Sequence, residues 1–312
     1  MAGAGHRAVK AIMAVLGLCL TLMASGAVAA PYAGIVMDMR SGAIYYAHDI
    51  DRRQHPASLT KMMTLYLTFE ALQRGQIKLD QRVRVSRHAA RQPASKLYLR
   101  AGSRVRIRDL IRATAIKSAN DAAMVLAEAI GGSQKNFGRM MTQKARALGM
   151  KNSTFKNPHG LTQSGHLSTA RDMAVLARHL FYDFPQYYNV FGRKTHMAAG
   201  KRIRTTNRLL SSYRGAEGMK TGYTRAAGYN LVSVAARGQE RVIAVVMGGK
   251  STRSRNAQSV KLLDLGFRKA PTRVAVRKPA KPGLRRTVQV ARAPLPLPRP
   301  GLQATGFARV AE

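Results

Sequence analysis

Strand patterns occur near both ends of the central part of this chain, and helical patterns fill the region between them. Two early apolar segments, 34–39 and 43–48, flank a turn at 40–42 and predict a hairpin. Three late segments have the same alternation, at 219–223, 229–236 and 241–247. We therefore expect a mixed α/β (α+β) fold with one antiparallel sheet, built from distant parts of the chain, flanked by helices and carrying a helical insertion.

The predicted helices have apolar residues at three- and four-residue steps and end at glycines. Thr169 and Asp172 resemble a capping box at the start of one of them. The expected helices cover 59–72 with a stop at Gly75, 121–130 before Gly131, 133–148 before Gly149, 169–181, and a short closing helix at 256–265 stopped by Gly266.

Three short motifs follow one another along the chain: Ser58-Leu59-Thr60-Lys61, Ser118-Ala119-Asn120 and Lys220-Thr221-Gly222. A serine hydroxyl needs a neighbouring base to act as a nucleophile. Lys61 follows Ser58 by three residues, which places both side chains on the same face of a helix. The order of the motifs therefore indicates an acyl-transfer site.

Each motif also has a simpler interpretation when it is taken alone. Ser118 and Asn120 would be ordinary helix-start residues, and Gly222-Tyr223 would be a strand feature. Ser58 would be a helix cap beside a solvated lysine, but the apolar run around Lys61 argues against that. The chain contains a second S-x-x-K match at 153–156, which runs into Pro158, and a second S-x-N match at 254–256 in a late basic segment. Neither has the order and context of the first set.

The activation of Ser58 requires Lys61 to be neutral. Burial and nearby positive charge both lower a lysine pKa, and Lys220 is the candidate for that charge. Unpaired backbone N–H groups at the start of the Ser58 helix suit a developing oxyanion.

Together the three motifs resemble the signature set of penicillin-binding proteins and class A β-lactamases. Between residues 33 and 267 the chain is more narrowly similar to serine-type D-alanyl-D-alanine carboxypeptidases, the low-molecular-mass penicillin-binding proteins. The similar stretches are 56–64, 157–161, 168–174, 218–224 and 227–231. The resemblance implies a DD-peptidase/β-lactamase-like fold, removal of the terminal D-Ala from peptidoglycan stem peptides through an acyl-serine intermediate, inhibition by β-lactams, and no metal or other cofactor.

The resemblance also assigns roles to single residues. It implies that Ser58 is the nucleophile, Lys61 its base and Ser118 a proton relay. A second set of residues would bind the amide and the terminal carboxylate of the substrate. The backbone N–H groups of Ser58 and Tyr223 would form an oxyanion hole. The implied substrate-binding residues are Asn120, Lys220, Thr221, Gly222 and Tyr223. His159 and Asp172 lie in similar stretches, but we interpret them as a loop residue and a cap.

Three alternatives remain on the sequence alone. A DD-endopeptidase would share the site, and so would a β-lactamase, which needs a glutamate for fast deacylation. No Glu-x-x-x-Asn stretch occurs between Asn120 and Lys220, where the only glutamates are Glu128 and Glu217. A non-catalytic cell-wall-binding protein is the third alternative.

The net charge of +39 is typical of nucleic-acid binding, but the start of the chain argues for export. Basic residues precede an apolar run at 11–22, and Ala27-Val28-Ala29 forms a small-residue cleavage site. We therefore expect a signal peptide at 1–29, no nucleic-acid partner, and a location in the periplasm or cell envelope, either free or peripheral to the membrane.

The composition changes again near residue 268. We expect a catalytic domain at 30–268 and a basic Pro/Arg-rich tail at 269–312 without regular structure. Such positive charge favours contact with anionic envelope polymers, although a solvated linker would have the same composition.

Overall fold

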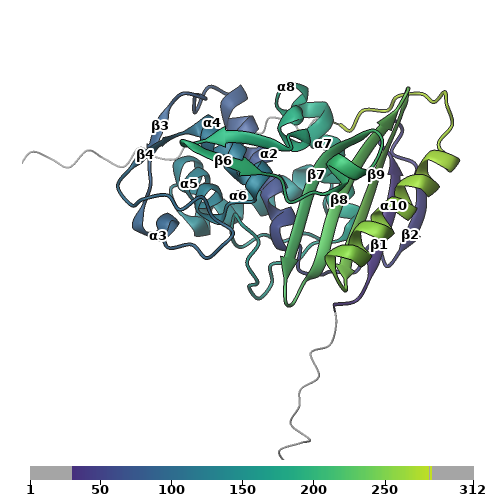
Figure 1. Ribbon diagram of the computed structural model, residues 1–312, viewed down its shortest axis with the longest axis horizontal. Coiled ribbons are helices and arrows are strands. Elements are labelled where there is room, and N and C mark those ends of the chain that lie inside the picture. The colour runs from purple at the N-terminus through teal and green to yellow at the C-terminus, as the bar shows by residue number, and fades with distance from the viewer. Residues whose placement is uncertain (1–29, 281, 283–312) are drawn as a thin grey trace, which may run out of the picture. The chain divides into compact units, whose positions relative to one another are not determined.

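A five-stranded antiparallel sheet in the order β2-β1-β9-β8-β7 forms one side of the computed structural model (Figure 1). The structure describes residues 30–280 and 282, so the expected signal peptide and nearly all of the tail beyond 280 lie outside the described residues. The strands are β1 Ala33–Asp38, β2 Ile44–His48, β7 Ala216–Thr224, β8 Gly228–Arg237 and β9 Glu240–Gly249. The predicted sheet of early and late segments is confirmed.

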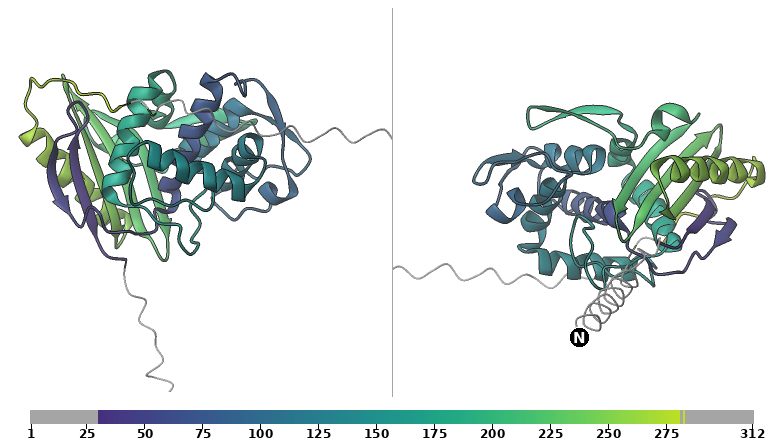
Figure 2. Two further views of the ribbon diagram at one scale, coloured as in Figure 1. Left: turned by 180° about the vertical axis from the view of Figure 1, so that it is seen from behind. Right: turned by 60° about the horizontal axis from the view of Figure 1, so that its bottom comes forward.

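Each face of the sheet is covered by a helix, because apolar residues alternate along the strands. On β9, Val242, Ala244 and Val246 pack against the outer helix α10, Thr252–Lys269. The residues between them face the opposite side, where α7, Ala170–Asp183, contacts the sheet. Figure 1 shows α10 in front of the sheet, and Figure 2 shows the teal helical segments that lie across it from behind.

The closing helix is longer than predicted. It begins after Ser251, which forms a capping box with Ser254, and it continues past Gly266 to Lys269. Gly266 is buried, and a Cβ at this position would overlap the side chain of Val242. The glycine therefore allows α10 to approach the sheet closely and does not stop the helix.

The helical insertion lies between β2 and β7. Its central helix α2 has eleven buried residues out of fourteen, which is the pattern of a helix enclosed on all sides. Besides α7, the insertion contains the following helices and helical turns: η1 Ala57–Leu59, α2 Thr60–Gln73, α3 Arg87–Ala90, α4 Ile107–Arg112, the π-helical turn η2 Ala113–Lys117, α5 Asn120–Gly131, α6 Gln134–Ala147, α8 Pro185–Tyr188, η3 Asn189–Gly192 and α9 Leu209–Ser212.

Only half of the predicted capping box at the start of α7 is present. Thr169 accepts a hydrogen bond from the backbone N–H of Asp172, as expected for an N-cap. The Asp172 carboxylate instead accepts hydrogen bonds from Ser153 Oγ, at 2.6 Å, and from the N–H of Asn152. Asp172 therefore joins α7 to the loop that follows α6.

Two short ribbons were not predicted. The first pairs β3, Arg82–Arg84, with β4, Arg104–Arg106, and the second pairs β5, Thr195–Ala198, with β6, Lys201–Arg204. Strands of three or four residues are too short to show the alternating apolar run on which the sequence interpretation depends, and three of them, β3, β4 and β6, consist mostly of arginine and lysine.

The segment directly after α10 follows the edge of the body. Arg40 donates hydrogen bonds to the carbonyl oxygens of Pro271 and Thr272, and the N–H of Arg277 donates to the Arg40 carbonyl. Arg40 itself is held by the buried carboxylate of Asp38. The first residues of the expected tail are thus fixed to the turn between β1 and β2. In the described part of the chain, no helix is long and apolar enough to cross a membrane.

The β3–β4 ribbon places arginines opposite each other, Arg82 with Arg106 and Arg84 with Arg104. All four side chains are exposed, and like charges in cross-strand pairs destabilise a sheet. We predict that Arg104→Glu raises the free energy of unfolding by about 0.5 kcal/mol, because an opposite-charge pair replaces a like-charge pair. Urea unfolding at low salt measures this change, which high salt should reduce.

The control for this prediction is Lys151→Glu, which makes the same charge change at an exposed position outside the ribbon. A gain equal to that of Arg104→Glu would mean that net charge, and not the cross-strand pair, accounts for the stabilisation.

Candidate active site

Ser58 and Lys61 meet at the start of α2. Ser58 lies in the single turn η1, which leads directly into the helix, so that Lys61 follows one turn later on the same face. The Lys61 Nζ atom lies 2.9 Å from Ser58 Oγ. The proximity predicted from their spacing is therefore present.

The Lys61 amine is completely buried and has two further partners. Nζ donates to Asn120 Oδ1 at 2.7 Å and to the backbone oxygen of His159 at 2.7 Å. These partners come from the first residue of α5 and from the loop that precedes α7. One nitrogen thus joins three separate segments of the chain.

The surroundings of Lys61 favour its neutral form. Burial is the main cause of a pKa well below the usual lysine value, and the positive charge of Lys220 lowers this pKa further, whereas Asp121 opposes the shift. Lys220 is also buried, and burial together with Arg255 lowers its pKa to about 7. The predicted electrostatic effect of Lys220 on Lys61 is consistent with these shifts.

A cavity of about 580 Å³ opens in front of Ser58. Lys61 and Lys220 do not line it but lie buried behind its wall. Six of the eight sequence-predicted site residues line the cavity, namely Ser58, Ser118, Asn120, Thr221, Gly222 and Tyr223. In the part of the chain described here, no group of three or more His, Cys, Asp or Glu side chains is arranged to hold a metal ion.

The second motif forms one wall of the cavity. Ser118 follows the π-helical turn η2 and has a left-handed backbone, with a φ of 65°. Asn120 begins α5, and its amide is engaged at both ends, since Nδ2 donates to the Pro93 oxygen at 2.9 Å and Oδ1 accepts from Lys61. Asn120 therefore fixes the base and the neighbouring loop in addition to lining the cavity.

The third motif lies on β7. Lys220 Nζ donates to the Thr221 carbonyl at 2.9 Å, and Thr221 Oγ1 lies 2.6 Å from Thr206 Oγ1. A Cβ on Gly222 would come within 3.0 Å of the backbone nitrogen of Ser58, so glycine allows this strand to pass close to the nucleophile. The Tyr223 side chain is half exposed and its ring lies beside that of Tyr229.

The other lining residues include three with basic side chains that sequence reasoning did not assign to the site, namely His159, Arg208 and Arg255. Arg255 is buried, and burial with the nearby charge of Arg208 lowers its pKa to about 10. His159 is also buried, and its burial is the main reason why its pKa lies well below the usual histidine value. The backbone oxygen of His159 accepts the hydrogen bond from Lys61. Similarity of the 157–161 stretch was the one available signal for His159.

The rejected motif matches lie elsewhere. Ser153 is fully buried and hydrogen-bonded to Ser168 Oγ and to Asp172. Ser254 belongs to the capping box of α10. Neither serine lines the cavity, although Arg255, in the middle of the second S-x-N match, does.

The comparisons with known proteins agree with one another. A family model described as D-alanyl-D-alanine carboxypeptidase matches residues 22–251. The chain is 39% identical over 237 residues to D-alanyl-D-alanine carboxypeptidase DacF of Bacillus subtilis, covering 75% of this chain and 61% of the relative. It is 42% identical over 243 residues to DacC of Escherichia coli, covering 76% and 61%.

Solved structures give the same picture. Penicillin-binding protein 5 from Haemophilus influenzae is similar with a TM-score of 0.73 at 39% identity, over 76% of this chain and 70% of that one. Penicillin-binding protein D2 from Listeria monocytogenes, solved in an ampicillin-bound form, has a TM-score of 0.70 at 32% identity, over 75% and 96%. The chain spans about six tenths of the length of the curated relatives DacF and DacC.

The loop that holds Lys61 depends on a glycine. Gly160 has a φ of +87°, and a Cβ there would overlap the carbonyl oxygen of Ala57, next to the nucleophile. We predict that Gly160→Ala lowers the free energy of unfolding by about 3 kcal/mol or more, because backbone and not a flexible side chain must move. Urea unfolding measures the loss.

Gly149→Ala is the matched control, since Gly149 has a similar φ of +81° but open space around it. Its expected cost is about 1 kcal/mol, from backbone strain alone. Equal losses in the two variants would show that contact with Ala57 contributes nothing.

Proposed function

Because the chain belongs to the D-alanyl-D-alanine carboxypeptidase family, we propose that it removes the terminal D-Ala from peptidoglycan stem peptides through an acyl-serine intermediate. The observation that carries this proposal is the buried Lys61 amine, which lies 2.9 Å from the Oγ atom of Ser58, a residue that lines the open cavity. β-Lactams would acylate the same serine, and the reaction needs no metal.

In the acylation step Ser58 Oγ attacks the carbonyl carbon between the two D-Ala residues, and the Lys61 amine takes the hydroxyl proton. A neutral amine has two N–H donors and one lone pair. Asn120 Oδ1 and the His159 oxygen accept the two donors, which directs the lone pair at Ser58. The geometry therefore supports Lys61 as the base.

The leaving D-Ala needs a proton on its nitrogen. Ser118 lines the cavity, and we assign it the relay that returns the proton from Lys61. The C–N bond breaks, D-Ala leaves as the amine, and the peptide remains as an ester on Ser58. Water then attacks this ester and gives a proton to Lys61, which passes it to Ser58 Oγ as the ester C–O bond breaks and the shortened peptide leaves with a new carboxylate.

The negative charge on the carbonyl oxygen would be stabilised by the backbone N–H groups of Ser58 and Tyr223. The close approach of β7 to Ser58 N at Gly222 supports this oxyanion hole. For the terminal carboxylate we assign Thr221 and Lys220, as the motif implies, and we add Arg255, a buried guanidinium on the cavity wall. Asn120 is the assigned contact for the substrate amide.

A β-lactamase is less well supported. Of the two glutamates between Asn120 and Lys220, Glu128 accepts a hydrogen bond from Ser86 and Glu217 pairs with Arg241. Neither lines the cavity, so neither can activate a deacylating water there. We therefore expect the acyl-enzyme formed with a β-lactam to be hydrolysed slowly. The endopeptidase alternative is separate, because an endopeptidase would use the same residues on a different peptide.

We also propose an exported protein of the periplasm or cell envelope, with a signal peptide at 1–29, a catalytic domain at 30–268 and a basic tail at 269–312. Contact of the tail with anionic envelope polymers is part of this proposal and follows from its charge. Nucleic acid is not an expected partner.

We predict that Ser58→Ala abolishes both D-Ala release from a peptide ending in D-Ala-D-Ala and covalent labelling by a fluorescent penicillin. Ser153→Ala is the control, because it changes the serine of the other S-x-x-K match and lies outside the cavity. Labelling that survives in Ser58→Ala would refute Ser58 as the nucleophile. Labelling without D-Ala release from the unchanged chain would refute the carboxypeptidase activity.

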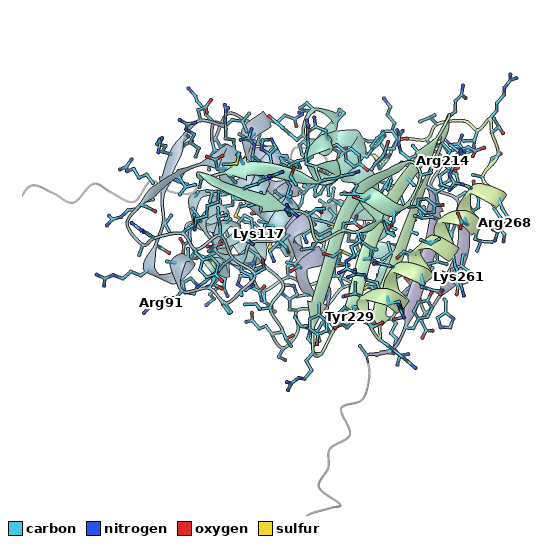
Figure 3. The ribbon with its side chains drawn as sticks, viewed as in Figure 1. Arg91, Lys117, Arg214, Tyr229, Lys261 and Arg268 are labelled. Atoms are coloured by element: carbon cyan, nitrogen blue, oxygen red, sulfur yellow. The ribbon has the colours of Figure 1, made fainter. Side chains whose placement is uncertain are left out.

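The charge of Lys220 lowers the pKa of Lys61, and Lys220, with a pKa of about 7, carries that charge at acidic pH. We predict that Lys220→Met raises the pKa of Lys61 and so moves the acidic limb of the acylation rate to higher pH. The pH dependence of penicillin acylation measures this shift. Lys261→Met, on the outer helix α10, is the control and should leave the acidic limb of the acylation rate unchanged (Figure 3). An acidic limb that moves to lower pH in Lys220→Met would contradict the argument.

A further inference from the structure

An exposed tyrosine is held in a strained conformation close to the cavity. Tyr98 has a φ of 61°, which side-chain-bearing residues rarely adopt, and 64% of it is exposed. Its neighbours Leu97 and Leu99 are both buried. The loop thus anchors both flanking residues and presents the one between them to solvent.

A buried carboxylate enforces this presentation. Asp121, completely buried in the first turn of α5, accepts hydrogen bonds from the N–H of Leu97 at 2.9 Å and of Leu99 at 3.1 Å. Strained backbone of this kind persists only where its surroundings over-determine it, and it occurs preferentially at functional sites.

Two lysines flank the Tyr98 ring. Lys96 Nζ lies 5.3 Å and Lys201 Nζ 5.7 Å from the ring centroid, within cation–π distance. Lys201 also donates to the Leu97 carbonyl at 2.9 Å, which joins β6 to the loop. Among the residues that the structure describes, neither lysine has an acidic partner within ion-pair distance.

This cluster adjoins two chain segments that contribute residues to the cavity lining. Ala94 and Ser95 line the cavity, and Tyr98 follows Ser95 by three residues, a span of about 10 Å at most. Lys201 is the first residue of β6, and this strand of four residues leads into Thr205 and Thr206, which also line the cavity. Because Ser58 lines the same cavity, a peptide that extends from it past either segment would run toward the cluster.

We propose that Lys96, Tyr98 and Lys201 form an outer subsite that binds a carboxylate-bearing residue of the peptide, upstream of the bond to be cleaved. The inference rests on the proposed function for the direction in which the peptide lies. Each ammonium group lies beside the Tyr98 ring and still offers N–H donors and a positive charge to a ligand. A carboxylate is the peptide group that fits such a pair of donors. Tyr98 holds the lysines in place.

The test compares two peptides that end in D-Ala-D-Ala and differ only in Glu or Gln, two residues before the first D-Ala. The chain should cleave the Glu peptide with a KM lower by about three- to tenfold, the range expected for one or two exposed ion pairs. The variant Lys96→Gln/Lys201→Gln should lose this preference, so that its KM values for the two peptides become equal. High salt should reduce the preference in the unchanged chain.

Lys151→Gln/Lys261→Gln is the matched control, since it removes two exposed positive charges away from the cavity. Equal KM values for the two peptides in the unchanged chain would overturn the proposal. A preference that survives in Lys96→Gln/Lys201→Gln, or that the control variant loses as well, would also overturn it.

Failure of the proposed function would look different, because neither peptide would release D-Ala. Binding then decides, measured by the anisotropy of the same two peptides carrying a fluorescent label, with Ser58→Ala protein. Tighter binding of the Glu peptide that depends on Lys96 and Lys201 would support the subsite without the reaction. Equal binding of the two peptides would overturn it.

Discussion

The burial of one amine organises this structure. Lys61 is completely removed from solvent, and an unpartnered amine there would cost several kcal/mol. Its nitrogen is satisfied by Ser58, Asn120 and the backbone of His159, which belong to η1, α5 and the loop before α7. The helical insertion must therefore close on α2 from two sides, and that closure brings the first two motif segments together beside one cavity.

Sequence reasoning succeeded where the physical cause is local. Alternating apolar residues identified all five strands of the sheet, and the three-residue step from Ser58 to Lys61 fixed their proximity. The expected helix 133–148 corresponds to α6, Gln134–Ala147, since its apolar face and capping serine are both local signals.

It failed where a residue is used by a distant part of the chain. Gly266 looked like a helix stop, but it is a contact point with Val242 on another element. The His159 carbonyl that holds Lys61 has no sequence signature, because every residue carries a carbonyl group. Arg255 reaches the cavity only because α10 starts beside β8 and β9. Such contacts depend on topology, which composition and periodicity do not report.

The first two residues of α5 couple the base to the cavity wall. Asn120 accepts a hydrogen bond from Lys61, and its amide holds Pro93, whereas Asp121 holds Leu97 and Leu99. The Asp121 carboxylate is also the negative charge that opposes the lowered pKa of Lys61. A group that anchors the loop thus acts on the proton affinity of the base, so that displacement of the loop anchor would change the electrostatics at Ser58 as well as the shape of the rim.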